Sequence, residues 1–448
     1  MVLRTVGTAT GGATAREEVS PQQWRWSVLA GMASYLDAGS IVALGAGLAL
    51  FQSSLELTST VVGALAAIGP NAIGCAIGAF IGGRLGDRLG RKRIYKYDLL
   101  VYAAGVLCVA LSVEPVTLFA GVFVIGVAVG ADVPTSLALV GEFSPPKARG
   151  RLLGFTQVAW SLGPVVVLVL ALALAPLGLL GIRIVFFHLL AVALVTWALR
   201  QGLTESPRWQ AASAAAASAP AAARHALRDL FSGAHLRALL WTGTIYVFWG
   251  LAAGTAGIFT PYFVRTLGAG GQAASVALSC GGFVVSIVVT VLVFMRHADG
   301  SYATRRVLWG VGAVLQIVAY GLFVVLPFTI PVIVLNIVLF STGGALAGEA
   351  FYKVFSQELF PTLLRGTAQG FTFGVARMVL GVWSFFVPAL AQAGVAAVGA
   401  LLSLFLLVSG VVGVLFMPDT SGKTLELIEA ERAGAGGGVR ARGAREGA

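Results

Sequence analysis

Charge is scarce in this sequence. Charged residues make up 11% of the 448 positions, whereas 58% of the positions are hydrophobic. A soluble domain has about 25% charged residues. A soluble fold of this length cannot bury so much apolar surface, because surface area does not fall fast enough with size. The composition therefore excludes an ordinary soluble domain and predicts that the excess apolar surface faces lipid.

Cysteine is rare as well, with only 3 residues. Cys75, Cys108 and Cys280 lie in apolar segments, are odd in number and lack the spacing of metal ligands, so we expect packing residues. The sequence also has no phosphate-binding loop, no H-E-x-x-H and no G-x-S-x-G. We therefore expect no catalytic residues, no metal and no cofactor, which argues against an enzyme and an ATP-driven pump.

Long apolar runs are what the chain has in abundance. A bilayer core of ~30 Å needs ~20 residues of helix, and twelve segments meet this length. The sequence thus predicts an all-α protein of the cell (inner) membrane with twelve transmembrane helices. They are expected at residues 26–52, 57–82, 94–112, 116–141, 152–175, 180–199, 238–262, 272–295, 307–327, 330–353, 367–391 and 395–416.

Positive charge collects in every second loop. The formal net charge is +11, which in a soluble protein would suggest a nucleic acid partner. Here the charge follows the positive-inside rule, so both termini are expected in the cytoplasm. We expect the lipid bilayer, and not nucleic acid, to be the partner of these charges. We also expect the protein to be a monomer. The basic loops are 84–93, 147–151, 200–237, 296–306 and 353–365.

One short pattern occurs twice. Residues 142–150 and 358–366 both read E-x-x-P-x-x-x-R-G, after the fourth and the tenth segment. Duplicated helical halves with a polar site between them are the usual architecture of secondary transporters. We therefore expect a disordered tail (1–22), an N-terminal six-helix half (23–200), a cytoplasmic linker (201–237), a C-terminal six-helix half (238–417) and a cytoplasmic tail (418–448).

The loop after the second segment carries the most specific motif. It reads Gly83-Arg84-Leu85-Gly86-Asp87-Arg88-Leu89-Gly90-Arg91-Lys92. This resembles the G-x-x-x-D-R-x-G-R-K signature of the major facilitator superfamily at every fixed position. In that family the loop latches the inner gate, so the resemblance implies gating roles for Asp87, Arg88 and Arg91. We extend this expectation to the repeated loops and their residues Glu142, Arg149, Glu358 and Arg365.

Further stretches resemble the sugar-porter branch of that superfamily. Residues 205–209 resemble its P-E-S-P-R-W, and residues 418–426 resemble its P-E-T-x-G-x-T-L-E. Gln157 resembles a glutamine that contacts sugar in the branch, and Asp37 resembles an aspartate that accepts the proton in proton-coupled members. The resemblance implies the two-halved major facilitator fold and transport of a small polar solute.

The chain departs from the branch at several site positions. Val122 stands where the branch has an arginine, Phe248-Trp249-Gly250 lies where it has Q-Q-x-x-G, and Phe351-Tyr352-Lys353 replaces its P-x-x-W. A hexose-specific site is therefore not implied. The run Ser-Gln-Glu-Leu-Phe-Pro-Thr-Leu-Leu-Arg-Gly at 356–366 resembles bacterial inositol-type members, which favours a polyol.

Four ionisable residues lie deep in the predicted spans: Asp37, Asp132, Glu349 and Arg377. A charged side chain there costs ~2.5–3.5 kcal/mol on insertion scales, so such groups are functional candidates. Three acids against one base favour a proton on one carboxyl group, which would couple transport to the proton gradient. Asp37 is our first choice for the proton carrier and Asp132 the second; a static ion-pair network, with Glu349 bound to Arg377, is the structural alternative.

The expected function is a secondary transporter, working by alternating access, that moves protons together with a polyol or sugar such as inositol. Its solute site is expected to include Gln157, Trp160, Trp249, Glu349 and Arg377. A symporter of a small organic anion bound by Arg377, a drug or metabolite exporter, and a membrane sensor or scaffold remain as alternatives. The exporter motif G-P-x-x-G-G is only half present, as Gly163-Pro164.

Overall fold

The computed structural model describes residues 18–218, 227–266, 272–392 and 394–432. Residues 1–17 of the tail that we expected to be disordered (1–22) lie outside these ranges, but its last two residues are helical, because the first helix begins at Pro21. The first helix, α1 (Pro21–Ser54), shows how the sequence sets a helix start. The Ser20 hydroxyl accepts a hydrogen bond from the Gln23 backbone at 3.2 Å, and the Gln23 side chain accepts one from the Ser20 backbone at 2.9 Å. This capping box satisfies two backbone donors that the helix itself cannot.

The described residues are almost entirely helical. In the N-terminal part of the chain α1 is followed by α2 (Ser59–Ile68), α3 (Ile73–Leu89), α4 (Arg91–Ala110), α5 (Pro115–Phe143), α6 (Arg149–Ala173), a short 3-10 turn η1 (Ala175–Leu177) and α7 (Leu179–Arg200). Next come α8 (Pro207–Ser218) and a second 3-10 turn, η3 (Leu227–Phe231). The C-terminal part holds α9 (Gly233–Thr266), α10 (Gln272–Val289), the π-helical turn η4 (Thr290–Phe294), α11 (Met295–His297), α12 (Tyr302–Val325), α13 (Ile330–Leu346), α14 (Glu349–Glu358), α15 (Arg365–Gln392) and α16 (Val395–Leu415).

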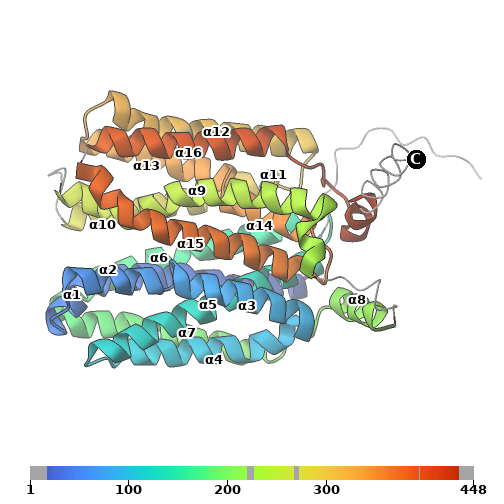
Figure 1. The fold of residues 1–448 in the computed structure, drawn as a ribbon, viewed down its shortest axis with the longest axis horizontal. Coiled ribbons are helices and arrows are strands. Elements are labelled where there is room, and N and C mark those ends of the chain that lie inside the picture. Colours follow the sequence, from blue (N-terminus) through green and yellow to red (C-terminus); the bar gives the residue numbers. More distant parts are fainter. Residues whose placement is uncertain (1–17, 219–226, 267–271, 393, 433–448) are drawn as a thin grey trace, which may run out of the picture.

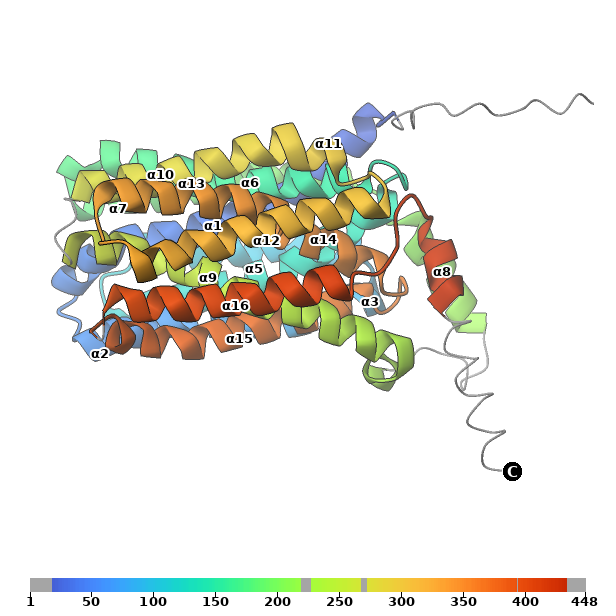
Figure 2. The same cartoon turned by 90° about the horizontal axis from the view of Figure 1, so that it is seen from above.

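The long helices lie side by side in two groups. Figure 1 shows α1–α7 below and α9–α16 above, with all long helices running roughly along one direction. We call these groups the N-terminal and the C-terminal bundle. They meet where α3 packs on α15 and where α6 packs on α10 and α14. Helix α8 and the segment after α16 project beyond one end of both bundles (Figures 1 and 2), where the basic loops gather, and we call this the basic end.

Close helix approach explains several glycines. A Cβ atom on Gly83 of α3 would lie 2.2 Å from the Gly366 carbonyl oxygen, and one on Gly370 of α15 would lie 2.2 Å from the Ala79 carbonyl oxygen. Neither position tolerates a side chain in this arrangement. Small residues are thus what bring α3 and α15, from opposite bundles, into backbone contact near the basic end.

Nine helices in the described part of the chain are long and apolar enough to cross a membrane. Two expected spans differ from the prediction because the helix is interrupted. The second breaks between α2 and α3, which have 10 and 17 residues. The tenth breaks after Leu346, restarts at Glu349 and continues to Glu358. Lys353, which we placed where the tenth span meets its basic loop, therefore lies inside a helix and is only 1% exposed.

Candidate functional site

Asp37 and Arg377 link the two bundles through an ion pair. Asp37 lies halfway along α1 and Arg377 halfway along α15. The Arg377 Nη2 atom donates to Asp37 Oδ2 at 3.0 Å, and the Trp160 Nε1 atom donates to the same oxygen at 3.1 Å. Arg377 also donates to the Asn71 side-chain oxygen at 2.8 Å. The other carboxylate oxygen of Asp37 is buried and has no hydrogen-bond partner among the described residues.

A second polar link crosses between the bundles. The Lys353 ammonium on α14 donates to the Gln157 side-chain oxygen on α6 at 2.8 Å. Glu349 lies one turn earlier on α14, with 3.7 Å between its carboxylate and the Lys353 nitrogen. The Tyr246 hydroxyl lies 3.5 Å from the same carboxylate oxygen. Glu349 also begins α14, so its negative charge lies at a helix N-terminus, where it is stabilised.

These links balance charge in the centre of the molecule. Asp37 and Glu349 supply two negative groups, and Arg377 and Lys353 supply two positive ones, all buried. The sequence predicted three acids and one base here. That count included Asp132, which lies elsewhere, and left out Lys353, which we had placed at the edge of a loop. The Glu349–Arg377 pair that we considered is replaced by Asp37–Arg377 and Glu349–Lys353. With all four groups ionised, their formal charges cancel.

A cavity lies between the bundles at these groups. Trp160, Trp249, Glu349 and Arg377 line it, and Gln157 lines an adjoining cavity that shares Trp160 and Trp249. The five residues that we expected to bind solute thus line two adjoining cavities with Trp160 and Trp249 in common, while their role in binding remains a prediction. Further lining comes from Ala38, Asn71, Tyr246, Gly250, Phe283 and Ala376.

Aromatic side chains form one wall of this cavity. The Tyr246 ring stacks on Tyr352 at a centroid distance of 3.8 Å and lies nearly parallel to Trp249 at 6.0 Å. The Trp249 Nε1 atom is buried and has no hydrogen-bond partner in the described residues. Flat apolar faces with a few polar groups between them are typical of small-molecule sites.

Asp132 does not belong to this site. It lies on α5, and its carboxylate accepts hydrogen bonds from Arg200 at 2.9 Å and from Ser136 at 2.5 Å. Arg200 is the last residue of α7, is fully buried and also contacts Asp98 at 3.5 Å. Asp132 is therefore held within the N-terminal bundle and does not line the central cavity. This position makes it a poor second choice for the proton carrier.

The predicted gating residues converge at the basic end. Asp87, at the end of α3, accepts hydrogen bonds from the backbone nitrogens of Gly366 at 3.0 Å and Thr367 at 2.6 Å, at the start of α15. Arg91 lies next to it, with 2.9 Å between the two charged groups. A carboxylate at a helix N-terminus satisfies free backbone donors and meets the positive end of the helix dipole. This contact holds the two bundles together.

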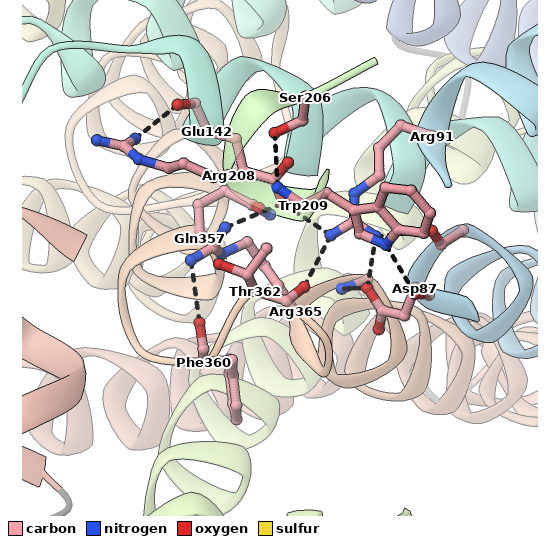
Figure 3. A network of polar contacts seen from close by, with 12 residues as sticks. Asp87, Arg91, Glu142, Ser206, Arg208, Trp209, Gln357, Phe360, Thr362 and Arg365 are labelled. Atoms are coloured by element: carbon pink, nitrogen blue, oxygen red, sulfur yellow. Dashed lines mark hydrogen bonds and ion pairs between the residues drawn. The ribbon is translucent and has the colours of Figure 1, made fainter. Parts of the chain in front are cut away.

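Glu142 is the centre of the same network, as Figure 3 shows. One of its carboxylate oxygens accepts from Arg91 at 2.7 Å and from Arg365 at 3.0 Å. Residues of the α8 segment close over this network, because Arg208 donates to the Glu142 carbonyl at 2.6 Å and Trp209 donates to the Asp87 carbonyl at 2.8 Å. Arg88, in contrast, is exposed at the end of α3 and lies outside the buried network.

The repeated loop builds a related network. Arg149 at the start of α6 contacts Glu358 at the end of α14 at 3.0 Å, and Arg305 contacts the same carboxylate at 2.9 Å. Asp299 accepts hydrogen bonds from the backbone nitrogens of Gly150 at 2.5 Å and Arg151 at 2.8 Å. Burial raises the pKa of Asp299, although these two hydrogen bonds oppose the change. The basic end is thus closed by contacts between the bundles on both sides.

Comparison with known proteins agrees with this architecture. Residues 27–388 match the Major Facilitator Superfamily, and the chain belongs to that family. It is 38% identical over 412 residues to the minor myo-inositol transporter IolF of Bacillus subtilis (strain 168), covering 90% of this chain and 93% of that protein. It is 26% identical to the glucose transporter GlcP of Staphylococcus epidermidis (strain ATCC 12228 / FDA PCI 1200), covering 87% and 92%.

The fold is similar to that of a solved sugar symporter. The structure of the proton:xylose symporter XylE bound to 6-bromo-6-deoxy-D-glucose matches with a TM-score of 0.77 at 18% identity, covering 91% of this chain and 98% of that one. The chain is therefore a sugar-porter-like, multi-pass transporter of the inner membrane and not an enzyme.

Sequence reasoning missed three polar residues that contact the buried charged groups. Lys353 and Arg200 lie at the ends of predicted spans, where polar residues are expected at the membrane surface. Asn71 is half-buried and lies inside the second predicted span, at the break between α2 and α3. A signal for Lys353 was present: it lies four residues after Glu349, the spacing of an ion pair on one helix face. No comparable pattern marked Arg200 or Asn71.

Proposed function

We propose that this transporter is a proton-coupled symporter of a neutral polyol, such as an inositol, or of a sugar. In this proposal twelve helices cross the membrane, both termini and the basic end face the cytoplasm, and the two halves (23–200 and 238–417) alternate in access. The names of the relatives support the solute class, since one is a myo-inositol transporter and another a glucose transporter. The name of the xylose symporter supports proton coupling.

The charge balance of the cavity favours a neutral solute. Asp37 is bound by Arg377, and Lys353 lies between Glu349 and Gln157, so neither cation lacks a partner. An added carboxylate would face Asp37 and Glu349 without a free cation. A polyol or sugar instead supplies hydroxyl groups and apolar ring faces, which match the polar atoms and the aromatic wall formed by Tyr246 and Trp249.

The observation that carries proton coupling is the Asp37–Arg377 pair. It joins α1 of one bundle to α15 of the other at 3.0 Å, and the second oxygen of the carboxylate has no partner in the described residues. Protonating Asp37 removes the charge that attracts Arg377, which weakens the link between the bundles. A buried pair that loses one charge becomes strongly destabilising. Proton binding therefore favours separation of the halves around the cavity.

The contacts at the basic end support one order of steps in this proposal. Asp87, Glu142 and Asp299 hold the halves together there, so with the basic end in the cytoplasm the state described would be shut on that side. In this state the proton and the solute are expected to enter from the opposite side. Opening toward the cytoplasm requires these contacts and the Asp37–Arg377 pair to separate.

The test is uptake by the purified full chain in proteoliposomes. Labelled myo-inositol, xylose, glucose and a small carboxylate would be compared with and without an inward proton gradient. We expect a neutral polyol or sugar to accumulate only with the gradient. Two cations near the cavity, Arg377 and Lys353, make a small organic anion the second candidate. Carboxylate-only uptake, abolished in Arg377→Gln, would establish that alternative and overturn the polyol proposal.

A further inference from the structure

Helices α6 and α14 are joined at two levels. At the basic end Arg149 contacts Glu358 at 3.0 Å. Further into the bundle the same two helices are joined again by Gln157 and Lys353 at 2.8 Å. Lys353 lies five positions before Glu358, about 7.5 Å along α14 at 1.5 Å per residue. The inner contact therefore lies between the gate and Glu349, which lines the central cavity. Because Gln157 lines the adjoining cavity, we call this contact the cavity floor.

Lys353 has two possible partners, and they belong to different bundles. Its bond to Gln157 on the N-terminal bundle is short, whereas Glu349 on its own helix is 3.7 Å away. Glu349 is weakly engaged in this state, because its other contact, Tyr246, lies at 3.5 Å. A charged hydrogen bond usually has a length of about 2.7–2.9 Å. A shift of about 1 Å by the ammonium would give Glu349 such a bond and release Gln157.

Gln157 is well placed to exchange Lys353 for a solute. Its side chain lines the cavity beside Trp160, and its amide nitrogen makes no hydrogen bond within the described residues. An ammonium group only donates, so Lys353 occupies the amide oxygen and leaves the nitrogen for another acceptor. A hydroxyl group both donates and accepts. A solute hydroxyl can therefore bind the amide nitrogen first and then replace Lys353 at the oxygen.

We propose that Lys353 is a solute-displaced latch. In the empty cavity it ties α14 to Gln157 across the bundles, and a bound polyhydroxylated solute transfers it to Glu349, which frees the cavity floor to open. This inference rests on the proposed symport. It assigns one tie between the bundles to each ligand: Asp37–Arg377 responds to the proton, and Gln157–Lys353 responds to the solute. Opening toward the basic end then requires both ligands, which prevents a proton from crossing alone.

The latch predicts opposite effects for its two charged residues. Lys353→Met removes the tie, so the solute no longer competes for Gln157 and should bind about tenfold more tightly, as expected for one charged hydrogen bond. The same variant should admit protons without solute. Glu349→Gln removes the alternative partner and keeps Lys353 on Gln157, so solute should bind more weakly and no proton leak should appear. The double variant should leak as Lys353→Met does.

The experiment uses the full chain in liposomes that contain a pH-sensitive dye, together with calorimetric titration of myo-inositol. Lys96→Met, at an exposed lysine on α4, is the matched control and should behave as wild type. If the Glu349–Lys353 pair only stabilises the fold, both single variants should lose affinity and neither should leak, and that result would overturn the latch. Absence of solute-driven proton entry in wild type would instead refute the proposed symport. In that case the latch would still be tested by solute affinity, which should rise in Lys353→Met and fall in Glu349→Gln.

Discussion

Asp87 and Asp299 make the same contact from opposite bundles. Asp87 accepts two successive backbone N–H groups at the start of α15, from Gly366 and Thr367, and Asp299 accepts two at the start of α6, from Gly150 and Arg151. The sequence around Asp299 keeps little of the signature around Asp87, yet its carboxylate has kept the contact. The gate at the basic end is therefore two-fold, with one capping carboxylate on each side.

Replacing either carboxylate should loosen this gate. In Asp87→Asn or Asp299→Asn the amide presents an N–H₂ group to one of the two backbone donors, so one charged hydrogen bond is lost. We expect each variant to shift the equilibrium toward the state open at the basic end by about 1.5–3 kcal/mol, or about tenfold or more. The distance between spin labels at the exposed positions Lys92 and Ala303, on opposite bundles, would report the two populations.

The double variant gives a stricter test of this gate. The two carboxylates share no hydrogen-bond partner, so their effects should add. Glu114→Gln, at an exposed carboxylate before α5, is the control and should leave the distances unchanged. Unaltered label distances in both single variants would show that these contacts do not hold the basic end closed.

A side chain at the α3–α15 crossing should also prevent closure. A Cβ atom at Gly370 would lie 2.2 Å from the Ala79 carbonyl oxygen, a contact that real structures do not contain. Gly370→Ala should therefore populate the open state and slow transport, as seen in the same label distances and in uptake. Gly45→Ala is the matched control, since no atom lies within 4 Å of its added methyl group. A Gly370→Ala protein that closes normally would contradict the close approach of these helices.

Asp132 and Arg200 should affect stability more than coupling. Asp132→Asn leaves Arg200 in contact with Asp98 and with the Leu29 carbonyl, so we expect proton-driven accumulation to persist. Arg200→Met leaves two buried carboxylates without their cation and should lower the free energy of unfolding by about 3–5 kcal/mol. Thermal unfolding in detergent and uptake in liposomes would separate the two effects. Loss of accumulation in a well-folded Asp132→Asn protein would return Asp132 to the coupling mechanism.

Much of the fold was predictable because apolar length and charged loops are local signals. The repeated E-x-x-P-x-x-x-R-G loops led directly to Glu142 and Glu358, which the structure places at equivalent buried contacts with Arg365 and Arg149. The breaks at Gly69 and Gly348 were not predicted, because each lies inside a segment that we marked as one apolar span, and hydropathy does not detect a helix interruption.

The pairing of the central charges could not be read from the sequence. Asp132 and Glu349 occupy similar places in the two halves, but Asp132 pairs with Arg200 inside one bundle, whereas Glu349 lines the cavity. Which partner a buried charge finds depends on the rotation of each helix and on residues far away in the chain. Lys353 was missed for a related reason, since a lysine near the end of an apolar run is ordinarily a surface residue.

The central claim is that a proton on Asp37 releases Arg377 and drives solute accumulation. Its most direct test compares two assays of Asp37→Asn in proteoliposomes: exchange of labelled for unlabelled solute without a gradient, and accumulation under an inward proton gradient. We predict that exchange continues while accumulation falls to the level of equilibration, and that wild type and Asp132→Asn still accumulate. Full gradient-driven accumulation by Asp37→Asn would contradict the account.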